Sequence, residues 1–157
     1  AEVSGGEVLW HAMPWEQSGY ALAEDERWIW QHEAHLIDED RLLLSSGLLT
    51  DPSLVPPELI GHSFDRTVVY EYVIDFEAGA LVLDWSYGSD DAEWVASYKG
   101  GAQRLSAGNT LHYYGSFGGL REVTDAGEVV WQLRVLGDEG PWIGRSTLLE
   151  DLYAFAP

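Results

Sequence analysis

Histidine and arginine side chains are the groups of this chain best suited to chemistry. The sequence has five histidines and no cysteine, so a nucleophile or a metal site would be built without thiolates. His32 and His35 are three residues apart; in a regular strand they point to opposite faces and cannot share one metal ion unless a bulge intervenes. His112 precedes Tyr113 and Tyr114, and is either a base near phenolic donors or a half-buried strand histidine. We favour the second interpretation.

Two arginines are candidates for binding an anion. Arg66 follows Asp65, so a local ion pair is the simple alternative to a ligand contact. Arg104 either faces a ligand or pairs with a carboxylate of this acidic chain, and we favour the carboxylate. The acidic clusters at 38–40 and 89–91 offer oxygen ligands of the kind Ca²⁺ takes, but both lie in short loops without a full ligand set. We therefore expect no metal ion and no cofactor.

The charge of the chain excludes several kinds of partner. There are 27 acidic and 8 basic residues, a net charge of −19, and this surface repels nucleic acid and anionic lipid. The charge suits a solvated surface of the type salt-rich habitats favour, a docking face for a basic partner, or a binder of hard cations. We favour the first, because the acids are spread along the chain. No apolar stretch is long enough to span a bilayer.

The elements that carry these residues are strands. Eight Trp, eight Tyr and four Phe favour an all-β fold. A glycine, a β-prone run and a tryptophan recur at 6–10, 79–85 and 127–131, and Trp85 and Trp131 are 46 residues apart. That spacing is typical of one four-stranded antiparallel blade of a β-propeller.

The sequence predicts one partial propeller domain over residues 1–157. It contains a blade end at 6–11, a blade at 28–87 with a proline-rich loop at 48–65, a blade at 101–136 and a closing strand at 146–154. The predicted strands are 28–37, 41–45, 66–75, 80–87, 101–105, 110–115, 120–124 and 128–136, with turns at 77–79 and 125–127. Two to three blades cannot close a ring, since propellers need about four or more. We expect the remaining blades to come from missing N-terminal sequence, another chain or self-association.

Several stretches, in this order, resemble the arylsulfotransferase family. The chain has QHEA at 31–34 and LLLSSG at 42–47, where the family has QHDA and LLFDNG. It has RTVVYEY at 66–72 and LDWSYG at 83–88, where the family has SRxVxYxID and WxYG. The family's GSxQRLPNGNTL and EVTPDGEVVW are matched by GAQRLSAGNTL at 101–111 and by EVT at 122–124 with GEVVW at 127–131. The resemblance covers about residues 6–136.

The resemblance implies a six-bladed propeller exported to the periplasm or the cell exterior. It implies transfer of a sulfuryl group between phenolic compounds through a sulfated histidine, at a funnel on the propeller axis. His32, Arg66 and Arg104 match family motif positions, and with His112 they are the candidate catalytic residues, with an aryl sulfate as ligand. Residues 89–100, where we look for the nucleophilic histidine, contain none. The alternative is therefore a non-catalytic propeller module for protein–protein interaction or extracellular assembly.

Overall fold

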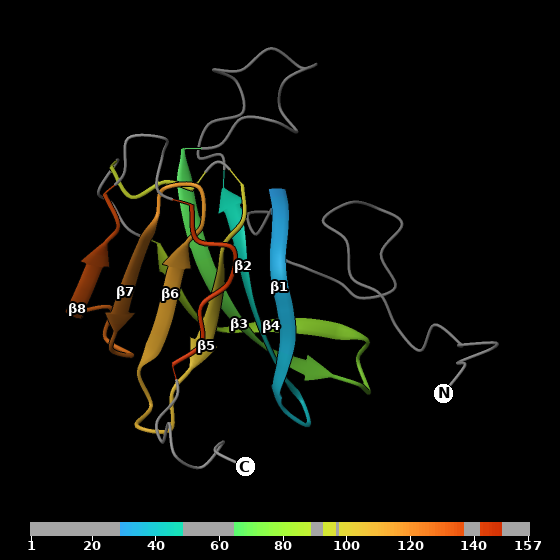
Figure 1. The fold of residues 1–157 in the computed structure, drawn as a ribbon. Helices are drawn as coiled ribbons and strands as arrows, with labels where there is room; N and C mark the ends of the chain where they lie inside the picture. The colour runs from blue at the N-terminus through green and yellow to red at the C-terminus, as the bar shows by residue number, and fades with distance from the viewer. Residues whose placement is uncertain (1–28, 49–64, 89–92, 97, 137–141, 149–157) are drawn as a thin grey trace, which may run out of the picture.

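Two four-stranded antiparallel sheets make up most of the described part of the protein (Figure 1). The structure is a computed structural model that describes residues 29–48, 65–88, 93–96, 98–136 and 142–148. Within these ranges every regular element is a strand, which confirms the prediction of an all-β chain with four-stranded antiparallel sheets. The first sheet holds β1 (Ile29–Asp38), β2 (Arg41–Leu48), β3 (Arg66–Asp75) and β4 (Ala80–Gly88). The second holds β5 (Gly101–Arg104), β6 (Thr110–Tyr114), β7 (Gly119–Val123) and β8 (Val129–Arg134).

Strands that follow one another in the sequence are neighbours in each sheet, so each sheet is a simple meander. Short turns join β1 to β2, β3 to β4, and the successive strands of the second sheet. Asp75 Oδ1 accepts hydrogen bonds from the backbone N–H groups of Glu77 (3.0 Å) and Ala78 (2.8 Å). Gly79 follows with a φ of 63°, and Gly127 has a φ of 80° in the turn between β7 and β8. Glycine reaches this left-handed region without a steric penalty, which is why the predicted turns at 77–79 and 125–127 form.

The two sheets repeat one register. Glu71 on β3 lies opposite Trp85 on β4, and Glu122 on β7 lies opposite Trp131 on β8. In both sheets a register shift follows the glutamate at once. The repeat inferred from the glycine and tryptophan spacing is therefore present in the strand pairing.

The core lies on both faces of the first sheet. Leu43 and Val69 pack against Ala102 of the second sheet, while Leu44 and Tyr70 are buried on the opposite face. Six consecutive residues of β3 are buried, as the apolar run at 68–74 predicts.

A short connection before β5 fills the other end of the sheet interface. The Trp94 ring lies 5.2 Å from Tyr114 and 4.9 Å from Phe117, and the Arg121 guanidinium lies 3.8 Å from the Trp94 ring centre. The Ala96 N–H donates to Thr67 Oγ1 (2.8 Å), which ties this connection to the first sheet.

The segment 142–148 runs along the second sheet without forming a strand (Figure 1). The Ile143 N–H donates to the Gly115 carbonyl (2.9 Å), and the Gln103 side chain bonds both backbone groups of Leu148 (2.8 and 3.3 Å). Residues 146–148 of the predicted closing strand therefore have no strand pairing, and 149–154 lie outside the described residues. The predicted blade end at 6–11 and all but the two end residues of the loop 48–65 also lie outside them.

Candidate functional site

A β-bulge in β1 places two histidines on the same face of the first sheet. His32 pairs with Ser45 and His35 pairs with Leu43. Between these two pairs β1 advances by three residues and β2 by two, so β1 contains one extra residue. Directly paired residues share a face, and Ser45 and Leu43 both face the second sheet. The expectation that His32 and His35 point to opposite faces is therefore wrong. The bulged residue is Glu33. Its backbone φ of 50° is rare for residues other than glycine, asparagine and aspartate.

His32 lies in a small cavity of about 240 Å³ that we call the lysine hollow. Because of the bulge, the consecutive residues His32 and Glu33 both line it. The described residues that line it are His32, Glu33, Lys99, Gly100, Tyr113, Gly144 and Arg145. These residues come from β1, from the connection that enters β5, from β6 and from the segment 142–148.

The His32 ring is neutral and oriented by the backbone. Burial lowers the pKa of His32 below its ordinary value of 6.5. Its Nε2 accepts a hydrogen bond from the Lys99 N–H (3.0 Å), so in the neutral ring the hydrogen is on Nδ1. His32 can thus donate from Nδ1, while the Nε2 lone pair is already engaged.

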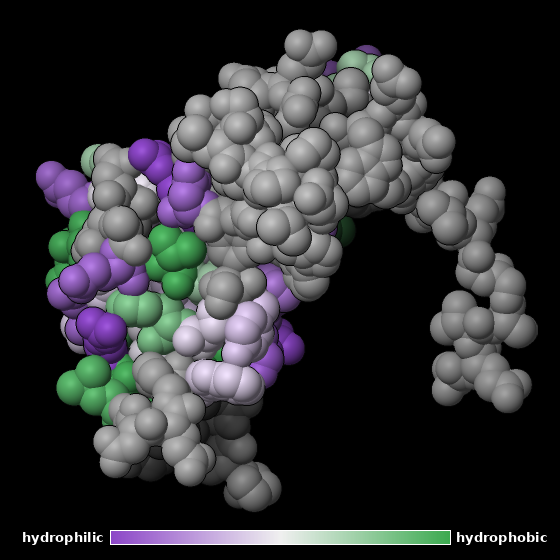
Figure 2. All heavy atoms as spheres, turned by 90° about the horizontal axis from the view of Figure 1, so that it is seen from above, coloured by the Kyte–Doolittle hydropathy of each residue, from purple (hydrophilic) through white to green (hydrophobic). Residues whose placement is uncertain are grey.

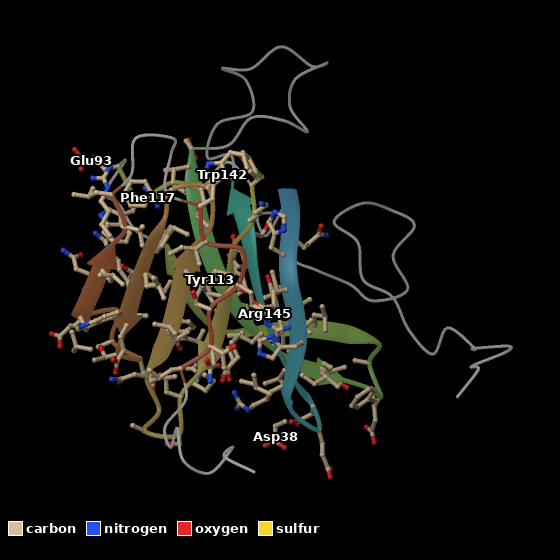
Figure 3. All side chains as sticks on the ribbon, in the orientation of Figure 1. Asp38, Glu93, Tyr113, Phe117, Trp142 and Arg145 are labelled. Atoms are coloured by element: carbon tan, nitrogen blue, oxygen red, sulfur yellow. The ribbon has the colours of Figure 1, made fainter. Side chains whose placement is uncertain are left out.

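The hollow collects positive charge in a very acidic protein. Lys99, the one lysine of the sequence, lies on its lining together with Arg145. Arg145 Nε is 2.7 Å from Glu33 Oε1, and Figure 3 shows Arg145 on the 142–148 segment beside β1. The Arg145 side chain is 76% exposed, so most of the guanidinium remains open to solvent.

An aromatic pair stands beside the same lysine. The Tyr98 and Trp142 rings meet edge to face at 5.5 Å, and Lys99 Nζ is 4.9 Å from the Trp142 ring centre. Both rings are exposed, Trp142 at 60%. Exposed aromatic faces next to a cation suit a ligand with an aromatic body and an anionic group.

Arg104 lies between the two sheets and links them through an ion pair. It forms an ion pair with the buried carboxylate of Glu71, bonds Asp125 Oδ1 at 2.9 Å, and lies 4.8 Å from the Trp85 ring centre. Arg41 completes the group with distances of 2.5 Å to Glu71 and 2.6 Å to Asp84. The favoured interpretation of Arg104, a carboxylate partner in an acidic chain, is confirmed.

The Arg104 cluster forms the floor of a larger open groove of about 910 Å³, the arginine groove, which His35 and Gln103 also line. His35 Nδ1 donates a hydrogen bond to the backbone carbonyl oxygen of Glu33 (3.1 Å), since a carbonyl oxygen can act only as an acceptor. Both arginines in this groove already have carboxylate partners, so it offers little unpaired positive charge to an anion.

His112 is fully buried between the sheets. Its Nε2 lies 3.4 Å from Ser45 Oγ, and its Nδ1 has no hydrogen-bond partner within the described part of the chain. Burial, helped by the charge of Arg121, lowers the pKa of His112 to about 3. We predicted a half-buried histidine; the structure makes it wholly buried, so His112 cannot contact a ligand from solvent.

Arg66 begins β3, three residues before Val69 in a regular stretch of pairing. Side chains three apart point to opposite faces of a strand, so Arg66 lies on the face away from His32. Of the four predicted site residues, the structure places only His32 in the lysine hollow.

Sequence reasoning missed Glu33, Lys99, Tyr113 and Arg145. A signal was present: an aromatic residue stands two positions before His32, before Gly100 and before Gly144. All three positions line the lysine hollow. Among the described residues no group of three His, Asp or Glu side chains could hold a metal ion, and no helix could cross a membrane.

Comparisons with known proteins give no relatives. No family model, no curated protein and no solved structure matches the chain.

Proposed function

We propose that this chain is part of an arylsulfotransferase-like β-propeller whose lysine hollow binds the anionic group of an aryl sulfate. The ordered motifs at 31–47, 66–88 and 101–131 support the family. The convergence of His32, Gly100 and Gly144 supports a propeller axis, because equivalent positions of successive blades meet there. On this proposal the two sheets are blades of a six-bladed ring, and the protein acts in the periplasm or outside the cell.

One observation carries the ligand assignment. The only lysine of a chain with a net charge of −19 lies at the hollow, with Arg145 on its lining and the exposed rings of Tyr98 and Trp142 beside it. Lysine and arginine bind sulfate oxygens through charge-assisted hydrogen bonds, and the rings give an aryl group a surface to contact.

The same geometry limits the role of His32. A histidine nucleophile needs a free lone pair, and His32 Nε2 already accepts from the Lys99 N–H. We therefore assign His32 to donate from Nδ1 to a sulfuryl oxygen. Arg104 and His112 take no part, since the first is paired with Glu71 and the second is inaccessible.

The test is binding of phenyl sulfate to the full chain by calorimetry, with Lys99→Met and Arg145→Met as variants. Each variant should weaken binding about fivefold or more, because each loses a hydrogen bond to a charged group. Arg134→Met is the matched control, because Arg134 is a half-exposed cation on β8, outside the hollow lining. Equal affinity of all four proteins would overturn the assignment of the hollow. Release of nitrophenol from 4-nitrophenyl sulfate, measured with added acceptor phenol, tests transfer itself.

A second candidate function is assembly without catalysis, which the surface of β8 favours. Every residue of β8 is exposed, including Val130 at 54% and Trp131 at 47%. Figure 2 shows hydrophobic side chains at its left edge, the side on which Figure 1 draws β8. Residues 129–136 contain no acidic residue in this otherwise acidic chain. An apolar edge strand without acidic residues is a ready template for pairing with another sheet.

Light scattering tests this candidate on the full chain. Association should decrease when Val130→Lys places a charge on β8, and it should not change with Val82→Lys, an equally exposed valine on β4. A wild-type chain that is monomeric at all accessible concentrations would remove self-association as its function.

A further inference from the structure

A carboxylate oxygen in the lysine hollow lacks a donor. Glu33 Oε1 pairs with Arg145, whereas Glu33 Oε2 is buried and has no hydrogen-bond partner within the described residues. An ionised carboxylate accepts several hydrogen bonds, and a buried acceptor left unpaired lowers stability. The bulge that turns Glu33 inward also requires a left-handed backbone, which is unfavourable for glutamate. Two unfavourable features at one residue point to a role in binding.

Glycine at position 101 allows this oxygen to lie close to the backbone of β5. A Cβ atom at Gly101 would overlap both Glu33 Oε2 and the Tyr113 hydroxyl. Figure 3 shows Tyr113 close to Arg145, between β6 and the segment 142–148. Gly144, on the lining, also lacks a side chain, and a Cβ atom there would contact nothing within 4 Å. The hollow is therefore open at Gly144, whereas Glu33 Oε2 is closely packed against Gly101.

The charges around Glu33 indicate which donor fits. Lys99 and Arg145 would repel an ammonium group, so a neutral hydroxyl is the better donor to Oε2. Arg145 touches Glu33 directly, so an anion bound by Arg145 lies close to the carboxylate. A hydroxyl adjacent to the anionic group would then reach Oε2.

We propose that Glu33 Oε2 accepts a hydrogen bond from a ligand hydroxyl, so that the lysine hollow selects aryl anions with an adjacent hydroxyl group. This inference rests on the proposed function and names the chemical feature of the ligand that the lysine hollow recognises. Lys99 and Arg145 hold the anion, Glu33 recognises the hydroxyl, and Gly101 allows the Glu33 carboxylate to take its position.

The test compares 2-hydroxyphenyl sulfate with phenyl sulfate by calorimetry on the full chain. The wild-type protein should bind the hydroxylated ligand about tenfold more tightly, the scale of one hydrogen bond to a charged group. In Glu33→Gln, the amide oxygen faces Arg145, the amide nitrogen replaces Oε2, and the preference should fall below about twofold. Glu39→Gln is the matched control, because Glu39 is an exposed carboxylate in the β1–β2 hairpin and should keep the wild-type preference.

If Glu33→Gln fails to fold, a second pair of variants still tests the inference. Gly101→Ala should weaken both ligands, because the new methyl group displaces Glu33 and Tyr113, and Arg134→Met, outside the hollow lining, should bind as wild type. Binding of both ligands by the wild type with equal affinity overturns this inference and leaves the proposed function standing. Binding of neither ligand overturns both.

Discussion

Glu71 joins the two sheets through an ion pair. Its buried carboxylate accepts from Arg41 in its own sheet and from Arg104 in the other. Removing one charge of a buried ion pair leaves the partner charges uncompensated, which costs far more than a surface pair contributes.

Glu71→Gln should therefore lower the free energy of unfolding by about 3 kcal/mol, measured by urea denaturation. Glu77→Gln, an exposed glutamate in the β3–β4 turn, should change it by less than about 0.5 kcal/mol. Equal effects of the two substitutions would mean that Glu71 does not hold the sheets together.

His112 makes the stability of the fold depend on pH. Its pKa is about 3 in the folded protein and 6.5 when unfolded, so the unfolded chain takes up the proton first as the pH falls. Its contribution to stability is complete above about pH 6.5 and decreases as the pH drops toward 3. The lowered pKa of His32 acts in the same direction.

Between pH 7.5 and 5.5, His112 should account for a loss of about 1.4 kcal/mol in the free energy of unfolding. The comparison is wild type against His112→Gln in urea at both values of pH, and the variant should lose that much less. Identical losses would show that His112 is accessible to protons in the folded state.

At the scale of elements, one glycine decides how the connection 93–96 packs. A Cβ atom at Gly119 would lie 2.5 Å from the Trp94 ring and 2.8 Å from the Phe117 ring. Gly119→Ala should therefore push Trp94 from its place beside Tyr114 and destabilise the fold by about 1–3 kcal/mol.

The near-ultraviolet circular dichroism of Gly119→Ala should change together with its stability, because Trp94 and Tyr114 are in contact. Gly144→Ala is the control with open space around the new methyl group. An unchanged spectrum and melting temperature for Gly119→Ala would show that Trp94 has room to move.

The strands could be predicted well because their patterns are local. The predicted strand 66–75 has the bounds of β3, and the turns follow from Gly79 and Gly127. The bulge at Glu33 could not be predicted, because only its pairing with β2 and its contact with Arg145 reveal it. One extra residue in β1 moved His35 to the other face, and the predicted geometry of the two histidines failed for that reason alone.

The site was only partly predictable for the same physical reason. His32 was found from its motif, but Lys99 and Arg145 reach the hollow from segments 67 and 113 residues further along the chain. His112 and Arg104 have the residue types of an active site, and only the packing of the two sheets shows that they are buried or paired.

For the whole molecule, a net charge of −19 should make stability depend on salt. Like charges spread over the surface repel in the compact state, and ions screen that repulsion. The melting temperature should therefore rise between 0.05 and about 1 M KCl, with most of the rise at low concentrations where the screening length changes fastest. A melting temperature that falls with salt would mean that ion pairs such as Arg41–Asp84 outweigh the repulsion.

On the proposed function, the lysine hollow binds the anionic group of an aryl sulfate through Lys99 and Arg145. A crystal structure of the full chain soaked with phenyl sulfate tests it most directly. We expect the sulfate within hydrogen-bonding distance of Lys99 Nζ and the Arg145 guanidinium, with the phenyl ring against Trp142. A sulfate bound in the arginine groove, or a hollow closed to the ligand, would contradict the account.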